Sequence, residues 1–400
     1  MKKIVASLLW TLLLASCQNT STSETIVLKV WEDANNHEMV QLLLDEFIAN
    51  YRTMYPSAPL MEIELIEESE GATTDDLSRE GPAGNGPDVF AFVHDTLASA
   101  VNNDLIAEVT DVDFLNAHHQ EAAVKAFTYE DIVFGYPITS ESQVLMYDGD
   151  QLTADDVLSF ENLKTSGERI VMDVKNSDSN AYYTFALLTD ADLFGADGID
   201  KTSLNLATPA SINNLTSFAH DYQDVIINGT PDTALTIIDI GDAAGVISSP
   251  YLWDTFKSQI SNAKMAVIPS INATPLRPFS GYKGYGVSRY STSPALAHDL
   301  AKFLVSSIAQ EVRFNQKTLM PTIVDNERLN LTLADSIEAG VFSDSLNNSL
   351  TMPNIIAMGS YWATMNDAMT EIWNLGDQAT TTTVKEILTN ATNAIKSKIA

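Results

Sequence analysis

Few residues in this sequence have the types and spacing that catalysis or metal binding requires. Asp190 opens a segment that resembles a calcium-binding loop, but Phe194 and Lys201 occupy two positions that must supply oxygen ligands. The pair His118-His119 has no further histidine or cysteine at a metal-binding spacing. The sequence contains no serine-hydrolase elbow, phosphate-binding loop or His-Glu-x-x-His segment. We therefore expect no metal site, no cofactor and no catalytic centre.

Asp95 is an acid at a position where α/β proteins bind ligands. It closely follows an apolar run at residues 88–93, which Gly86-Pro87 introduces and which reads as a buried strand. Ligand sites of open α/β sheets lie at the carboxyl ends of the strands. We therefore expect the Asp95 carboxylate to face a ligand.

Cys17 is the one cysteine of the 400 residues. Lys2 and Lys3 and then the apolar run of residues 4–14 precede it, as in a secretory signal that is too short to span a bilayer. The tetrad ending in Cys17 resembles the bacterial lipobox, in which the thiol is diacylated. We predict a signal peptide at 1–16 and a lipidated cysteine with a flexible tether at 17–24, which places the chain on the extracytoplasmic face of the cell membrane. The alternatives are an ordinary signal or a cytosolic start.

The charge of the chain excludes several partners. Its formal net charge is −31, from 22 basic and 53 acidic residues, so nucleic acid, anionic lipid headgroups and strongly anionic ligands are disfavoured. We expect no contact with the membrane other than through the lipid. Because the only cysteine is assigned to the anchor, neither a disulfide nor a cysteine nucleophile is expected.

The predicted elements indicate an α/β fold. Residues 26–31, 61–66 and 88–93 have the β-branched or alternating pattern of strands, and apolar residues at helical spacing follow Glu38. This order predicts a mainly parallel sheet. Ser293-Pro294 predicts the start of a further helix, whose apolar stripe runs to Ile308. About 380 residues exceed what one hydrophobic core organises, so two lobes are expected.

The stretch at residues 84–95, Gly-Asn-Gly-Pro-Asp-Val-Phe-Ala-Phe-Val-His-Asp, carries a family resemblance. It is similar to a segment of the maltose/maltodextrin-binding proteins, the extracytoplasmic receptors of ABC sugar importers. Further landmarks follow in the family's order, and the resemblance covers nearly all of residues 25–400. These landmarks are Trp31, Tyr136-Pro-Ile-x-x-Glu141, Tyr182-Tyr183-Thr184-Phe185, Pro250-Tyr-Leu-Trp253, Arg277-Pro-Phe279 and Pro353-Asn-Ile-x-x-Met358-x-x-Tyr-Trp362.

The resemblance implies a periplasmic-binding-protein-like fold, with two α/β lobes joined by an interlobe hinge and a ligand cleft between them. The N-terminal lobe would comprise residues 25–138 plus 267–320, and the C-terminal lobe residues 142–262 plus 325–400. The implied protein is a monomeric receptor, not an enzyme. It would capture a maltodextrin-like oligosaccharide and deliver it to the permease subunits of an ABC importer that a cytoplasmic ATPase drives.

The resemblance also implies which residues bind the ligand. Carboxylates accept hydrogen bonds from neighbouring sugar hydroxyls, and flat aromatic rings stack on the apolar faces of sugar rings. The implied ligand-binding set contains two acids and five aromatic residues, namely Asp95, Glu141, Trp31, Tyr182, Tyr251, Trp253 and Trp362.

Departures from the family pattern leave the exact ligand open. The family has a lysine after the first-strand tryptophan, where this chain has Asn35-Asn36, and Asn366 stands in place of a basic residue. A different neutral oligosaccharide or a non-sugar solute is therefore an alternative to maltodextrin. An extracellular glycosidase is a further alternative, because two carboxylates about 5 to 10 Å apart could act on a glycosidic bond.

Overall fold

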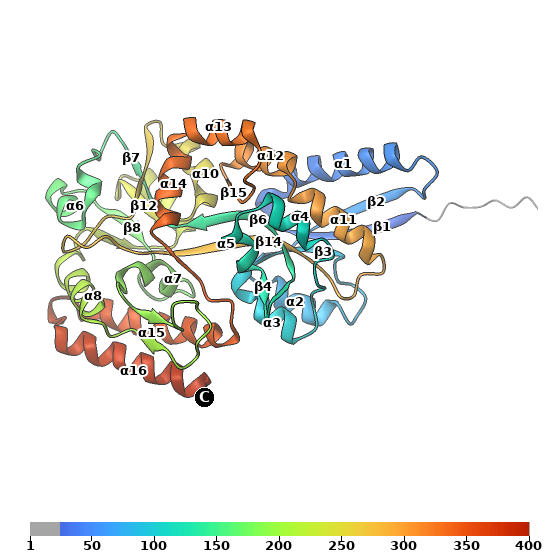
Figure 1. Cartoon of the computed structure of the whole chain (residues 1–400). Coiled ribbons are helices and arrows are strands. Elements are labelled where there is room, and N and C mark those ends of the chain that lie inside the picture. Colours follow the sequence, from blue (N-terminus) through green and yellow to red (C-terminus); the bar gives the residue numbers. More distant parts are fainter. Residues whose placement is uncertain (1–24, 400) are drawn as a thin grey trace, which may run out of the picture.

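Two β-sheets form the centres of the two halves of the chain in the computed structural model, which describes residues 25–399 (Figure 1). Cys17, the predicted signal peptide and the whole of the predicted tether lie outside the described residues. The first sheet has the strand order β15-β6-β14-β3-β1-β2, with β16 paired to β14, and the second has the order β11-β8-β12-β7-β13.

The first sheet is built from both ends of the chain. Its strands are β1 (Ile26–Glu32), β2 (Met61–Glu67), β3 (Val89–Val93), β6 (Gly135–Ser142), β14 (Phe279–Val287), β15 (Met320–Pro321) and β16 (Leu350–Thr351). The helices connected to it are α1 (His37–Met54), α2 (Thr73–Glu80), α3 (Leu97–Asn102), α4 (Val112–His118), α5 (Glu121–Ala126), α11 (Pro294–Leu304) and α12 (Ser307–Lys317), and a small hairpin is formed by β4 (Thr128–Tyr129) and β5 (Ile132–Val133).

The second sheet takes its strands from the middle of the chain. They are β7 (Val144–Asp148), β8 (Ile170–Met172), β11 (Ile226–Asn228), β12 (Gly245–Ser248) and β13 (Ala263–Val267), with a separate hairpin of β9 (Asp192–Leu193) and β10 (Leu204–Asn205). The remaining helices are α6 (Phe160–Ser166), α7 (Asn180–Thr184), α8 (Pro209–Asp221), α9 (Pro231–Asp239), α10 (Trp253–Gln259), α13 (Glu327–Asp335), α14 (Ile337–Asn347), α15 (Gly359–Leu375) and α16 (Thr381–Ile399).

The chain passes from one sheet to the other between β6 and β7 and returns between β13 and β14. The two-lobed α/β prediction is confirmed, and β1 pairs in parallel with β2 and β3 as expected. Both sheets are nevertheless mixed and not mainly parallel. In the first sheet, β14 runs antiparallel to both β3 and β6. The strands next to the connections between the halves therefore pair antiparallel, unlike β1 with its neighbours. The predicted lobe boundaries within this arrangement stay a prediction.

One predicted helix is divided in two. Its apolar stripe was expected to continue to Ile308, but α11 ends at Leu304 and the Oγ of Ser306 accepts a hydrogen bond from the backbone of Ala309 to start α12. Ile308 is 53% exposed. The Ser306 cap therefore outweighs the apolar spacing that would extend one helix across this point.

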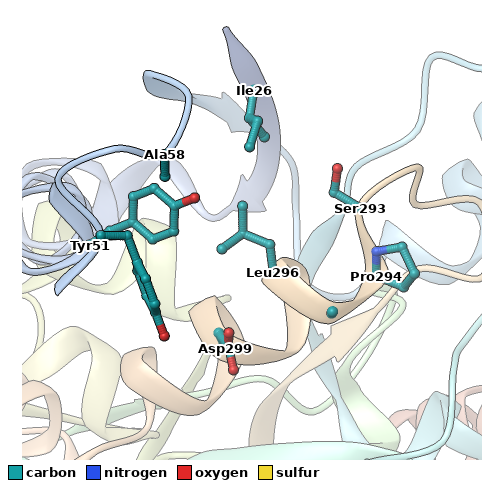
Figure 2. Close-up of a pocket in the computed structure, with 9 residues that line it drawn as sticks. Ile26, Tyr51, Ala58, Ser293, Pro294, Leu296 and Asp299 are labelled. Carbon is teal, nitrogen blue, oxygen red and sulfur yellow. The ribbon is translucent and has the colours of Figure 1, made fainter. Parts of the chain in front are cut away.

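An apolar groove of about 440 Å³ lies at the amino-terminal end of β1 (Figure 2). Tyr51 and Tyr55 line one side, and Pro294 and Leu296 at the start of α11 line the other. This groove lies at the end of β1 opposite to the carboxyl ends of the parallel strands, where the ligand site is expected. Within residues 25–399, no helix has both the length and the apolar composition needed to cross a membrane.

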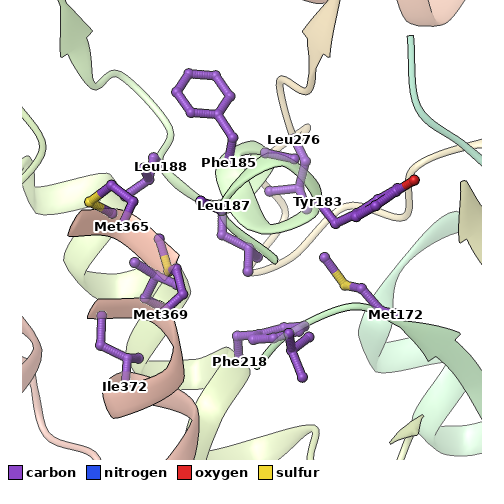
Figure 3. Close-up of a cluster of buried hydrophobic side chains, with 14 of the residues drawn as sticks. Met172, Tyr183, Phe185, Leu187, Leu188, Phe218, Leu276, Met365, Met369 and Ile372 are labelled. Atoms are coloured by element: carbon purple, nitrogen blue, oxygen red, sulfur yellow. The ribbon is translucent and has the colours of Figure 1, made fainter. Parts of the chain in front are cut away.

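The largest hydrophobic core fills the second half (Figure 3). Met365, Met369 and Ile372 repeat at helical spacing on α15 and pack towards Leu187 and Phe218. This packing fixes α15 against the core of the second half. Trp362, one helical turn before Met365, is held by the same packing and is only partly buried.

Candidate ligand-binding cleft

A cavity of about 680 Å³ brings together five of the seven predicted ligand-binding residues. They come from separate elements of both halves, and all five reach one space. They are Asp95 in the short helix at His94–Thr96, Glu141 on β6, Tyr182 on α7, Tyr251 in the short helix at Pro250–Leu252, and Trp362 on α15. The cavity is therefore the candidate site.

Two of the aromatic rings rest on Phe279, the first residue of β14. The ring of Trp362 lies 5.8 Å from that of Phe279 at an interplanar angle of 64°, and the ring of Tyr182 lies 6.2 Å away at 20°. Phe279 is itself fully buried and stacks on Phe185. Because this base is fixed in the core, the two rings form a rigid aromatic platform with two faces inclined to each other, and each face suits the C–H face of a ring-shaped ligand.

Polar contacts hold α7, which carries Tyr182. The backbone N–H of Ala181 donates to the Asn366 Oδ1 at 2.7 Å, and the Asn180 side chain donates to the Asn366 carbonyl at 3.0 Å. Asn366 is the residue that replaces a basic one in the family pattern, and here it fixes α7 to α15. The Tyr182 hydroxyl lies 3.2 Å from the Ser249 hydroxyl, and burial raises its pKa, so it stays a neutral donor.

Asp95 lies beside a histidine whose position is fixed. The Nδ1 of buried His94 accepts a hydrogen bond from the Tyr282 backbone N–H at 3.1 Å, and its Nε2 donates to the Met352 carbonyl at 2.9 Å. Burial lowers the pKa of His94 and raises that of Asp95, although the charge of each opposes the shift of the other. Among residues 25–399, no basic side chain forms an ion pair with Asp95, and such a partly buried acid suits a ligand that donates hydroxyl groups.

Lys283 on β14 also lines this cavity, and the sequence did not indicate it as a candidate. Its ammonium lies 2.7 Å from the Glu70 Oε2 and 3.1 Å from the Glu141 Oε1. Burial alone lowers the pKa of Lys283, but the two carboxylates outweigh it and hold that pKa well above its ordinary value. The one available signal was a lysine inside a buried aromatic and glycine strand, Phe-Ser-Gly-Tyr-Lys-Gly-Tyr.

A second cavity of about 630 Å³ adjoins the first. Asp33, Ser69, Glu70, Tyr251 and Lys283 line both cavities, so the two are arms of one cleft. The second arm is lined mainly by polar residues, Asn35 and Asn36 among them. The first arm is the aromatic one.

A buried ionic group supports the wall of the second arm. The Arg313 Nη2 donates to the Tyr285 hydroxyl at 2.8 Å, and that hydroxyl donates to the Glu32 carboxylate. The side chain of Asn36 donates to the other Glu32 oxygen at 2.9 Å. These contacts fix the end of β1 against β14 and orient the polar groups of this arm.

Two predicted site residues do not line the cleft. Trp31 is 4% exposed, because β1 lies between β2 and β3. The Trp31 side chain packs in the same core cluster as Phe90. Trp253 is 2% exposed and stacks on Phe256 in another core cluster. We therefore correct both assignments: the burial of these rings gives them a packing role and leaves them no surface for a ligand.

The other polar motifs have structural partners. His118 pairs with Asp325, and the Nδ1 of buried His119 lies 2.9 Å from the Thr322 hydroxyl. In the weak calcium-loop match, Asp192 accepts a hydrogen bond from the Gly195 backbone and so closes a turn. Within residues 25–399, no group of three or more histidine, cysteine or acidic side chains could hold a metal ion.

The fold and the cleft are those of a two-lobed solute-binding protein, and comparisons with known proteins define the family. A family model described as bacterial extracellular solute-binding protein matches residues 47–326, so the chain belongs to that family. It functions as an extracytoplasmic solute-binding protein. The predicted resemblance is thereby confirmed.

Individual relatives are distant but cover nearly the whole chain. A galactooligosaccharide-binding protein of Bacillus subtilis (strain 168) is 22% identical over 371 residues, which are 87% of this chain and 85% of the relative. A maltodextrin-binding protein of the same organism is 21% identical over 375 residues, 88% of this chain and 87% of the relative. A solved structure of a maltodextrin-binding protein from L. casei BL23 without ligand has a TM-score of 0.80 at 18% identity, with 93% of this chain and 99% of that chain covered.

Proposed function

We propose that this protein captures a neutral oligosaccharide in the cleft and delivers it to an ABC importer. The observation that supports this most is the aromatic platform of Tyr182 and Trp362 in one cavity with the carboxylates of Asp95 and Glu141. Such a site offers stacking surfaces and hydrogen-bond acceptors together, as a sugar requires. The names of the relatives favour a maltodextrin, with a galactooligosaccharide as the alternative within the same class.

The same contacts argue against glycoside hydrolysis. A glycosidase needs one carboxyl group that donates a proton and a second that acts as a base or nucleophile. Glu141 instead lies 3.1 Å from the Lys283 ammonium and forms an ion pair with it. We propose a receptor without catalytic activity, which acts as a monomer and closes by a hinge motion where β6 and β14 link the halves.

Titration calorimetry of the purified chain tests the proposed function. The panel contains maltotriose, maltotetraose, a β-galactotriose and a mixture of amino acids. We expect micromolar or tighter binding to at least one oligosaccharide and none to the amino acids. Binding of a non-sugar solute alone would overturn the carbohydrate assignment, and release of shorter sugars at enzymatic rates would overturn the receptor assignment.

We also propose that Cys17 carries the lipid that anchors the protein to the membrane. The support is its position after an apolar signal segment and the lipobox-like tetrad. A tether of few residues would hold the receptor close to its permease and raise the effective concentration for docking. Mass spectrometry of the membrane fraction should show a diacylated N-terminal cysteine. A Cys17→Ala variant should be lost from that fraction, and wild-type protein without lipid would refute the anchor.

A further inference from the structure

Lys283 lies at the junction of the two arms of the cleft and lines both of them. We propose that Lys283 determines the class of ligand, because it offers a hydrogen bond to a hydroxyl or ring oxygen of an uncharged sugar and no free positive charge to an acidic one. This inference rests on the proposed oligosaccharide function.

The register of the sheet brings Lys283 to Glu141. Glu141 on β6 lies opposite Gly281 on β14, and Lys283 lies opposite Thr139. Since side chains two residues apart share a face of a strand, Lys283 reaches Glu141 diagonally across a position that has no side chain. The pairing shifts immediately after Lys283, as at the β-bulges that redirect side chains near binding sites.

The ion pairs of Lys283 with Glu70 and Glu141 are largely buried, but the Lys283 side chain remains accessible from the cleft. The side chains of Glu70 and Glu141 are 9% and 11% exposed, and that of Lys283 is 19% exposed. An ammonium has three N–H groups. The two acids lie 2.7 and 3.1 Å from this ammonium, and the Glu141 Oε1 is left without a hydrogen bond. The two acids therefore engage at most two of the N–H groups, and at least one is left to donate to a ligand at the junction.

The charge around Lys283 decides what such a ligand can be. Two acids, Glu70 and Glu141, face one ammonium, and a single ionised carboxylate is enough to neutralise its positive charge within the cluster. The polar arm adds further acids and contains five carboxylates in all, at Glu32, Asp33, Glu70, Asp232 and Asp254. Among the described residues that line this arm, the only other cations are Arg313, which is hydrogen-bonded to Tyr285, and Lys317. A ligand carboxylate would therefore be repelled, whereas hydroxyl groups find both acceptors and a charged donor.

Calorimetry on matched variants tests the inference. The ligands are maltotriose, β-galactotriose and digalacturonic acid, and the proteins are wild type, Lys283→Met, Lys283→Arg and Lys264→Met. The last is a control, because Lys264 is an exposed lysine on β13 outside the cleft. Thermal unfolding of each variant identifies any that does not fold.

For the neutral sugar that wild type binds, we expect Lys283→Met to weaken binding at least tenfold and Lys264→Met to change it less than twofold. Lys283→Arg keeps a charged donor and should recover part of the lost affinity. It also serves as the test variant if Lys283→Met does not fold. Digalacturonic acid should not bind to any variant.

The possible failures are distinguishable. If wild type binds neither neutral sugar, the proposed function is overturned and this inference with it. If wild type binds but both Lys283 variants bind as tightly as wild type, only the inference is overturned. Binding of digalacturonic acid that depends on Lys283 would also overturn it.

Discussion

The buried carboxyl group of Glu70 predicts that the protein loses stability as the pH rises from 5 to 8. Burial raises the pKa of Glu70 from 4.5 to about 7, even though the charge of Lys283 opposes the rise. Between these values the folded chain holds a proton that the unfolded chain has released. This contribution to stability is therefore complete below pH 4.5 and is lost as the pH rises through 7. A pKa difference of this size corresponds to about 3 kcal/mol, of which roughly 2.5 kcal/mol falls between pH 5 and 8.

Urea unfolding followed by tryptophan fluorescence at pH 5, 6, 7 and 8 measures this loss. Glu70→Gln removes the titrating group and should reduce the loss of unfolding free energy between pH 5 and 8 by about 2 kcal/mol relative to wild type. Glu67→Gln is the matched control, since Glu67 is an exposed acid on the same segment, and should keep the wild-type slope. If wild type and Glu70→Gln lose stability equally over this range, Glu70 does not hold the proton and the reasoning is refuted.

Three further predictions concern the cleft, a core and the segment that follows β15. Trp362→Ala and Asp95→Ala should each weaken oligosaccharide binding at least tenfold, about 1.4 kcal/mol, in calorimetry; wild-type affinity in both would show that the site lies elsewhere. Trp253→Ala should lower the free energy of unfolding by about 3 to 5 kcal/mol with less than threefold effect on affinity, whereas loss of affinity at unchanged stability would restore its ligand role. Gln310→Leu should lower the free energy of unfolding in urea by about 2 kcal/mol or more. The reason is that the Gln310 Oε1 accepts hydrogen bonds from the backbone N–H groups of residues 322–323. An unchanged unfolding midpoint would contradict this.

Much of the fold was predictable because its signals are local. The alternation of residues 61–66 and the apolar run of residues 88–93 correspond closely to β2 and β3, and the helical spacing after Glu38 corresponds to α1. Antiparallel pairing by β14 was not predictable, because a strand's partners are set by contacts between residues nearly 200 positions apart, such as Lys283 and Val93.

The candidate site was predictable where its residues follow an element with a clear signal. Asp95 comes two residues after the end of β3, so its place at the edge of the sheet followed from the strand itself. For aromatic residues the sequence does not show which side of an element faces the core. Trp253 and Tyr251 are two residues apart, yet Trp253 is 2% exposed and Tyr251 is 43% exposed. Only tertiary packing separates the two.

The group formed by Lys283, Glu70 and Glu141 shows that the absence of a family residue from the sequence says little about which charges line the cleft. The sequence has Asn35-Asn36 where the family pattern has a lysine, which suggested that the cleft had lost a cation. Both asparagines line the polar arm, but so does Lys283, which comes from a strand almost 250 residues later. Of its two partners, Glu70 follows β2 and Glu141 lies on β6. Because the three residues are so far apart in the sequence, no local motif joins them. A cleft between two sheets can take its cation from any strand that reaches it, and the register of β14 against β6 determines which strand that is.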